Sequence, residues 1–339
     1  MLIRSLIFVI IASLSFNSFS QNQEGRFLGS KITKMPTWFF SSFMDLSEDV
    51  TESAQMGKKL LVYFHQDGCP YCNLLITKNF SDKATKAKIQ EAFNVIEINM
   101  WGDREVTNFN NKSFTEKDFA VFQKVQFTPT LIFFNEKGQQ VLRLNGYLPL
   151  DEFNQALDFV IADSFKSQTF AQYQKAKSDP KSKGELIAEP DLFSKQPYDL
   201  TKSKKPVVVF FESKNCKNCE SFHNKVLNDE TTRSILKELT VIQLDLHSNT
   251  KITTANGKEL TAQQWAKQLN VNFSPTIVFF NKAGKELIRS EAVFKTFHFQ
   301  SIADYVKTES YKHEAQFQRY LTERAERIRA TGKDVNIWQ

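Results

Sequence analysis

The sequence predicts an α/β protein built from two tandem copies of one domain, each with a mixed β-sheet flanked by helices. Three observations support this prediction. At 339 residues the chain is long enough for two domains. Three sequence blocks occur twice in the same order. Within each copy, short apolar runs typical of buried strands alternate with segments of helical periodicity.

The repeat is visible in the letters. The second copy of each block follows the first by 146 or 147 residues, so that order and spacing are kept with one net deletion. The paired blocks are LLVYFHQDGCPYC (60–72) with VVVFFESKNCKNC (207–219), VIEIN (95–99) with VIQLD (241–245), and TPTLIFFNEKG (128–138) with SPTIVFFNKAG (274–284).

Each copy is expected to follow one element order. A buried strand runs into a cysteine pair that opens a helix, and the helix restarts at an N-cap aspartate, Asp82 or Asp229. A second strand, a helix, two further strands and a final helix complete the copy. Strands joined both by helices and by a hairpin form a mixed sheet with both faces covered.

The chain is therefore divided into six segments. Pro, Ser and Lys concentrate between the copies and indicate an exposed linker, and apolar residues recur on one face of a helix after the second copy. The predicted segments are a signal peptide (1–20), an N-terminal extension (21–37), domain 1 (38–165), a linker (166–205), domain 2 (206–310) and a C-terminal helix (311–339).

The N-terminus and the charge bear on location and partners. MLIRSLIFVIIASLSFNSFSQ has one Arg, a short apolar run and small residues before Gln21, as in a signal peptide, with an uncleaved anchor as the alternative. We therefore expect an exported, periplasmic protein.

The net charge of +6 is spread over 44 basic and 38 acidic residues and forms no basic stripe, so nucleic acid is not an expected partner.

The four cysteines form two CxxC pairs, Cys69/Cys72 and Cys216/Cys219. A structural disulfide that encloses so short a loop gains little stability from chain entropy. Zinc ribbons separate their pairs by about 15–20 residues, whereas 143 residues separate these pairs. A redox function is the preferred interpretation, and we expect neither a metal nor a cofactor. A metal-binding module remains the alternative.

These motifs resemble the thioredoxin superfamily, in which a strand leads into CxxC, and Thr-Pro or Ser-Pro precedes a later strand. The first copy, with its GCPYC centre and its TPT, is most similar to SoxW-type periplasmic thioredoxins. The resemblance implies a cis proline beside each cysteine pair. The substrate-binding residues that it suggests are Pro70, Tyr71, Thr128, Pro129, Ser274 and Pro275.

The chemistry of two thiols assigns their roles. A helix N-terminus favours the thiolate form, so Cys69 is expected to attack a substrate disulfide and Cys72 to resolve the mixed disulfide. Cys216 and Cys219 take the same places in the second copy. That copy is either a second active centre or a degenerate one that only binds substrate or supports domain 1.

One departure from the family concerns proton transfer. Thioredoxins usually carry a buried acidic residue six positions before the first cysteine, where this chain has Tyr63 and Phe210. The sequence suggests no internal base in their place. His65 and His223 lie near the two pairs, and the simpler interpretation is that they are ordinary surface or packed residues.

The predicted activity is thiol–disulfide exchange on protein substrates, as a reductase or an isomerase. The family resemblance implies a membrane thiol donor that keeps the protein reduced. The direction depends on reduction potential and not on the motif. A non-catalytic, chaperone-like clamp of two such domains is the second alternative, and the sequence leaves the oligomeric state open.

Overall fold

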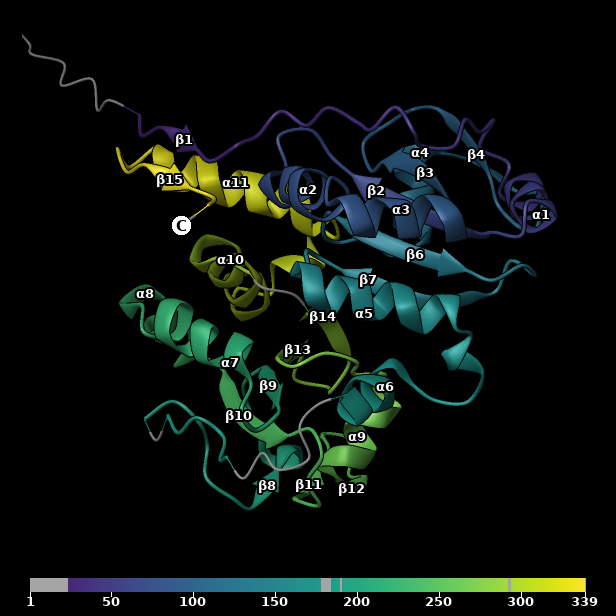
Figure 1. The fold of residues 1–339 in the computed structure, drawn as a ribbon. Helices are drawn as coiled ribbons and strands as arrows, with labels where there is room; N and C mark the ends of the chain where they lie inside the picture. The colour runs from purple at the N-terminus through teal and green to yellow at the C-terminus, as the bar shows by residue number, and fades with distance from the viewer. Residues whose placement is uncertain (1–23, 178–183, 190, 292–293, 339) are drawn as a thin grey trace, which may run out of the picture.

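The computed structural model describes residues 24–177, 184–189, 191–291 and 294–338. The predicted signal peptide, residues 1–20, lies outside these ranges. Two four-stranded mixed sheets confirm the predicted fold class (Figure 1). The elements of each half follow the same order along the chain.

The first sheet has the strand order β3-β2-β6-β7 and the second the order β10-β9-β13-β14. In the first sheet β2 pairs in parallel with β3 and antiparallel with β6, and β6 pairs antiparallel with β7. In the second sheet β9 pairs in parallel with β10 and antiparallel with β13, and β13 pairs antiparallel with β14. The strand bounds are β2 Lys59–His65, β3 Phe93–Asn99, β6 Thr130–Phe134, β7 Gln140–Asn145, β9 Val207–Glu212, β10 Thr240–Asp245, β13 Thr276–Phe280 and β14 Glu286–Ser290.

Helices cover both faces of each sheet, and apolar clusters fill the space between. Those of the first half are α1 Leu46–Gln55, α2 Pro70–Leu74, α3 Lys83–Ala92, α4 Glu116–Phe122, α5 Leu150–Ile161 and α6 Phe170–Lys177. Those of the second half are α7 Lys217–Phe222, α8 Glu230–Leu236, α9 Ala262–Gln268, α10 Thr296–Lys307 and α11 Phe317–Arg329. Small strands complete the list: β1 Phe27–Leu28, β4 Glu105–Thr107, β5 Ser113–Thr115, β8 Tyr198–Asp199, β11 Lys251–Thr253, β12 Glu259–Thr261 and β15 Val335–Asn336.

The helix after each cysteine pair restarts where the sequence predicts. Asp82 accepts a hydrogen bond from the backbone N–H of Thr85, and Asp229 accepts one from that of Thr232. Between the pair and the cap, both copies contain a π-helical turn, Leu75–Asn79 and His223–Leu227. The sequence did not predict this turn, because apolar spacing over so few residues does not separate π from α geometry.

The predicted C-terminal helix is present as α11. Phe317 and Tyr320 of α11 lie in the core of the second domain. The helix also reaches the first domain, where Gln318 donates a hydrogen bond to the carbonyl of Gln126. Beyond it, β15 pairs in parallel with β1, so the two ends of the described chain lie together.

Each domain contributes one phenylalanine to the hydrophobic core of the other domain. Phe127 of the first domain packs among the core residues of the second, against Phe294 and Phe317. Phe273, its counterpart in the repeat, packs in the core of the first domain against Phe170. The loops that carry both residues lead directly to the predicted Thr-Pro and Ser-Pro sites. The interface between the domains therefore adjoins both candidate centres.

Candidate active site

The first cysteine pair lies where β2 ends and α2 begins. Cys69 is the N-cap of α2, and its Sγ accepts a hydrogen bond of 3.0 Å from the backbone N–H of Cys72. The two cysteines form a disulfide with a Cα–Cα distance of 5.3 Å. Pro70 occupies the first helical position, where its missing N–H costs no helical hydrogen bond. A thiolate at Cys69 would face the free N–H groups of this helix end.

The Thr-Pro loop lies against this pair. The carbonyl oxygen of Thr128 is 3.4 Å from the Sγ of Cys69, and the Thr128 hydroxyl donates a 3.3 Å hydrogen bond to the same sulfur. The Thr128–Pro129 peptide bond is cis. Fifty-nine residues of sequence separate Thr128 from Cys69, so the fold brings these predicted site residues together.

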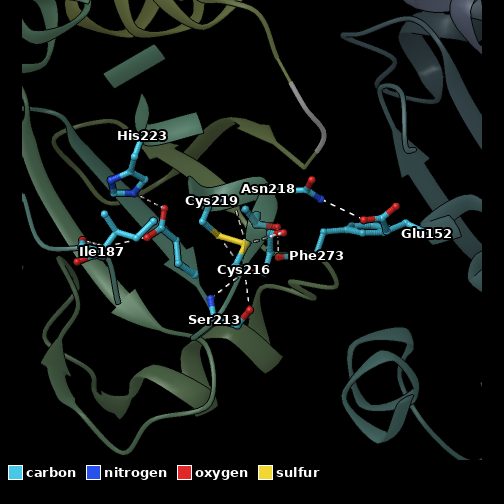
Figure 2. Close-up of a disulfide and its surroundings, with 12 residues drawn as sticks. Glu152, Ile187, Ser213, Cys216, Asn218, Cys219, His223 and Phe273 are labelled. Atoms are coloured by element: carbon cyan, nitrogen blue, oxygen red, sulfur yellow. Dashed lines mark hydrogen bonds and ion pairs between the residues drawn. A yellow bond between two sulfur atoms is a disulfide. The ribbon is translucent and has the colours of Figure 1, made fainter. Parts of the chain in front are cut away.

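The second pair repeats this geometry with one change (Figure 2). Cys216 caps α7, forms a disulfide with Cys219 and lies 3.4 Å from the carbonyl oxygen of Ser274, whose bond to Pro275 is also cis. The Ser274 hydroxyl, however, lies 3.4 Å from the Sγ of Cys219. It accepts hydrogen bonds from the backbone N–H and the hydroxyl of Ser213, which leaves its own proton for the sulfur.

The two centres differ in exposure. Cys69 is only 5% exposed, whereas Cys216 is half-buried. The Tyr71 ring packs against His298 and Trp338, and its hydroxyl accepts a hydrogen bond from the backbone N–H of Lys295. Burial raises the pKa of Tyr71. The predicted substrate-binding residue Tyr71 thus contacts the second domain, which covers the first centre.

The repeat places a weaker contact at the second centre. Asn218 occupies the position equivalent to Tyr71, and its side chain donates a hydrogen bond of 3.2 Å to Glu152 of the first domain. Glu152 is in turn the counterpart of His298 in the repeat. A single amide–carboxylate contact takes the place of the aromatic cluster, and this is consistent with the greater exposure of Cys216.

Each domain also has an imidazole–carboxylate pair. In the first domain, His65 Nε2 lies 2.5 Å from Glu97. Burial raises the pKa of Glu97, but the hydrogen bond and charge of His65, together with those of Arg104, outweigh it and leave that pKa lowered. In the second domain, His223 Nε2 lies 2.9 Å from Glu212, and both side chains are buried.

That no internal base replaces the acidic residue of the family stays a prediction. His65 and His223 are packed residues, as the simpler interpretation had it, but each is bonded to a carboxylate. The sequence held a partial signal, since His65 and Glu212 both lie four positions before the first cysteine of their pair. The partner could not be found in the same way, because Glu97 lies on the neighbouring strand.

The two cysteine pairs are closed separately, each by its own disulfide. Within the described ranges, no three His, Cys, Asp or Glu side chains are arranged to hold a metal ion. In that same part of the chain, no helix has both the length and the apolar character needed to cross a membrane.

Comparison with known proteins identifies the class. The profile of the thioredoxin-like domain matches residues 46–161 and again residues 193–307. The chain belongs to this thioredoxin-like family of thiol–disulfide oxidoreductases, with two domains in tandem. The predicted membership of the thioredoxin superfamily is confirmed.

One relative matches a shorter stretch of the chain. The thiol:disulfide interchange protein DsbD of Pectobacterium atrosepticum is 34% identical over 88 residues, which are 26% of this chain and 14% of that protein. The chain therefore matches only a small part of that relative's length.

Solved structures with a similar fold include a thioredoxin-fold protein from Helicobacter pylori (23% identity, 41% of this chain and 87% of that one, TM-score 0.35). The periplasmic thioredoxin SoxS of Paracoccus pantotrophus is 22% identical. The match covers 32% of this chain and 99% of that one, with a TM-score of 0.24. The first two thioredoxin domains of Saccharomyces cerevisiae Eps1p are 11% identical. The match covers 78% of this chain and 97% of that one, with a TM-score of 0.24.

Proposed function

We propose that this protein is an exported, periplasmic oxidoreductase that reduces or isomerises disulfide bonds in protein substrates. Cys69 and Cys216 attack the substrate, and Cys72 and Cys219 resolve the mixed disulfides. An extended substrate segment binds beside the thiols, along Thr128-Pro129 or Ser274-Pro275, with Pro70 and Tyr71 completing the first site. A membrane thiol donor returns the centres to the dithiol state. Export is inferred from the N-terminal sequence.

One observation carries the proposal. In both domains the first cysteine caps a helix, and its sulfur lies 3.4 Å from the carbonyl of the residue before a proline. The helix end stabilises a thiolate on the attacking sulfur. The neighbouring loop offers backbone groups to an extended peptide. The name of DsbD, a thiol:disulfide interchange protein, supports the same class of reaction.

Trapping tests each centre separately. Cys72→Ser is made in a chain whose second pair is serine, and Cys219→Ser in a chain whose first pair is serine. Each reduced variant is mixed with a peptide that contains one disulfide. If the disulfide of the peptide joins two separate strands, attack releases one strand as its thiolate, and we expect a stable adduct of the protein with the other strand, because the resolving thiol is missing.

The matched controls carry serine at Cys69 or Cys216 as well and should form no adduct. A non-catalytic clamp would bind the peptide equally well with or without these thiols, and it would form no covalent product. Absence of adduct at both centres would contradict the proposed function.

A further inference from the structure

A cavity of about 840 Å³ lies between the two domains. Residues of both edge strands, β7 and β14, line it (Figure 1). Several lining residues are equivalent in the repeat, separated by the same 146 residues, among them Arg143 with Arg289 and Asn145 with Glu291. Ligand sites commonly have volumes of about 300–1,000 Å³. The cavity is therefore large enough for a ligand, and it exists only because the two domains are docked.

The edges of β7 and β14 offer free backbone groups. Each strand is the last of its sheet and pairs with one neighbour only, and an edge strand presents a row of unpaired N–H and C=O groups. Among the described residues, no hydrogen bond joins the outer backbone edge of either strand to another element. The register shifts by one residue at Val141 and at Leu287, but residues 142–145 and 288–290 pair regularly with β6 and β13. These regular stretches can accept an added strand.

The cavity reaches the proline loop of the first centre. Asn145, the last residue of β7, lines the cavity and pairs with Thr130. The next residue, Gly146, donates a backbone hydrogen bond of 2.8 Å to the carbonyl of Pro129. Phe127, two residues before that proline, is also part of the cavity wall. A peptide in the cavity would therefore lie close to the loop that contacts the attacking cysteine.

The cavity reaches the second centre in the same way. Ser290, the last residue of β14, pairs with Ile277, two residues after Pro275. Glu291 follows directly, lines the cavity and accepts a hydrogen bond of 2.7 Å from the side chain of Asn145. The ends of the two edge strands thus meet, and one cavity adjoins the proline loops of both centres.

The charged groups of the cavity are nearly balanced. The lining contains three basic side chains, Lys124, Arg143 and Arg289, and two acidic ones, Glu286 and Glu291. Arg289 donates hydrogen bonds to both carboxylates, and Arg143 donates to neutral oxygens, including the carbonyl of Lys124. This arrangement leaves little net charge to select an ion. The free backbone edges are the groups that remain to recognise a ligand.

We propose that this cavity binds an extended segment of the polypeptide substrate whose cysteine reacts at either centre. The inference rests on the proposed function and names a binding site for it. The segment pairs its backbone with the free edges of β7 and β14. A strand residue occupies about 3.3 Å along the chain, 4.8 Å within a sheet and 10 Å across it, so the cavity has room for about five residues. Such recognition requires an unfolded segment and depends little on its sequence.

Photo-crosslinking of the trapped adducts tests the site. The substrate has two strands joined by one disulfide, and the strand that stays attached carries p-benzoylphenylalanine about four residues before its cysteine in one peptide and about four residues after it in another. Irradiation joins this side chain to a neighbouring residue, which peptide mass spectrometry identifies. For the adducts at Cys69 and at Cys216, we expect one of the two peptides to label residues 140–145 or 286–291. The same peptide with alternate backbone nitrogens methylated should still form the adduct but lose these labels, because it cannot pair as a strand.

A cavity-filling variant gives a second measurement. Val141 lines the cavity, so Val141→Trp should slow adduct formation with the peptide at least about tenfold, the factor that one or two lost backbone hydrogen bonds produce. The reaction with 5,5′-dithiobis(2-nitrobenzoic acid), which has no peptide segment, should be unchanged. Ile161→Trp is the matched control, because Ile161 is 38% exposed and lies outside the lining. It should alter neither rate.

The outcomes separate this inference from the proposed function. Adducts that form normally but label no residue of the cavity would overturn the inference and leave thiol–disulfide exchange intact. Labels that persist with the methylated peptide would also overturn it, because pairing through the backbone would then not hold the segment. Absence of both adducts would instead refute the proposed function. Crosslinking uses the cavity with its own residues, so the inference can be tested even if Val141→Trp does not fold.

Discussion

Phe127 and Phe273 occupy equivalent positions in the two repeats, and each packs into the hydrophobic core of the other domain. Each lies two residues before the proline that adjoins its own cysteine pair. Docking of the domains and the geometry of both centres are therefore linked through the same two loops. The two centres nevertheless differ in exposure, because the attacking cysteine is deeply buried only in the first centre.

Phe127→Ala tests this link. Removing a buried phenylalanine costs about 3–5 kcal/mol of unfolding free energy, through lost burial and the cavity that remains. We expect this loss in denaturant unfolding of the second domain, although the mutation lies in the first. Phe122→Ala is the control, since Phe122 is 52% exposed and its removal should change stability by less than about 0.5 kcal/mol. A normal second-domain transition in Phe127→Ala would contradict the packing described.

The two attacking cysteines should differ in reactivity. Cys69 is covered by the second domain and Cys216 is half-buried. In the reduced protein we expect iodoacetamide to modify Cys69 at least about tenfold more slowly, the factor that an opening free energy of about 1.4 kcal/mol produces. Peptide mass spectrometry over time measures both rates. Phe127→Ala should accelerate modification of Cys69, and equal rates in the wild-type chain would show that the cover is not maintained in solution.

His298, which packs on Tyr71, should make the domain interface sensitive to acid. Burial lowers its pKa to about 4. The unfolded chain therefore binds a proton between about pH 6.5 and 4 that the folded chain does not, and stability falls as pH falls through this window. His298→Phe should remove about 1–2 kcal/mol of the loss between pH 7 and 5. Denaturant unfolding at both pH values checks this, and an unchanged slope would show that His298 does not cause it.

Asp49 should act in the opposite direction. Burial raises its pKa to about 6, against a hydrogen bond from Ser42 that lowers it. The folded chain retains this proton between about pH 4 and 6, so stability falls as pH rises through that range. Asp49→Asn should be more stable than the wild type by about 1–3 kcal/mol at pH 7 and equal to it near pH 4. Glu52→Gln, on the exposed side of the same helix, should show no such difference.

The sequence predicts the parts of this molecule that depend on local pattern. The repeat, the strands that lead to each CxxC pair and the caps at Asp82 and Asp229 all follow from spacing and residue type. The domain interface does not, because Phe127 resembles any core residue and nothing local indicates that its core belongs to the other domain. The predicted role of Tyr71 did not anticipate its contacts with Trp338 and His298 for the same reason. These contacts join segments more than 200 residues apart.

The two imidazole–carboxylate pairs show the same limit. His65 and His223 are visible in the sequence, but their carboxylate partners come from other elements. Glu97 reaches His65 through the pairing of β3 with β2, and Glu212 reaches His223 where a helix crosses the sheet. The burial of each imidazole and its hydrogen-bond partner are tertiary properties, which residue type alone does not indicate.

Catalysed reduction of insulin by dithiothreitol tests the central claim most directly. The wild-type chain should accelerate the reaction, Cys69→Ser and Cys216→Ser should each keep the activity of the remaining centre, and the double variant should fall to the uncatalysed rate. A double variant as active as the wild type would contradict the account, because exchange would then not depend on the two helix-capping cysteines.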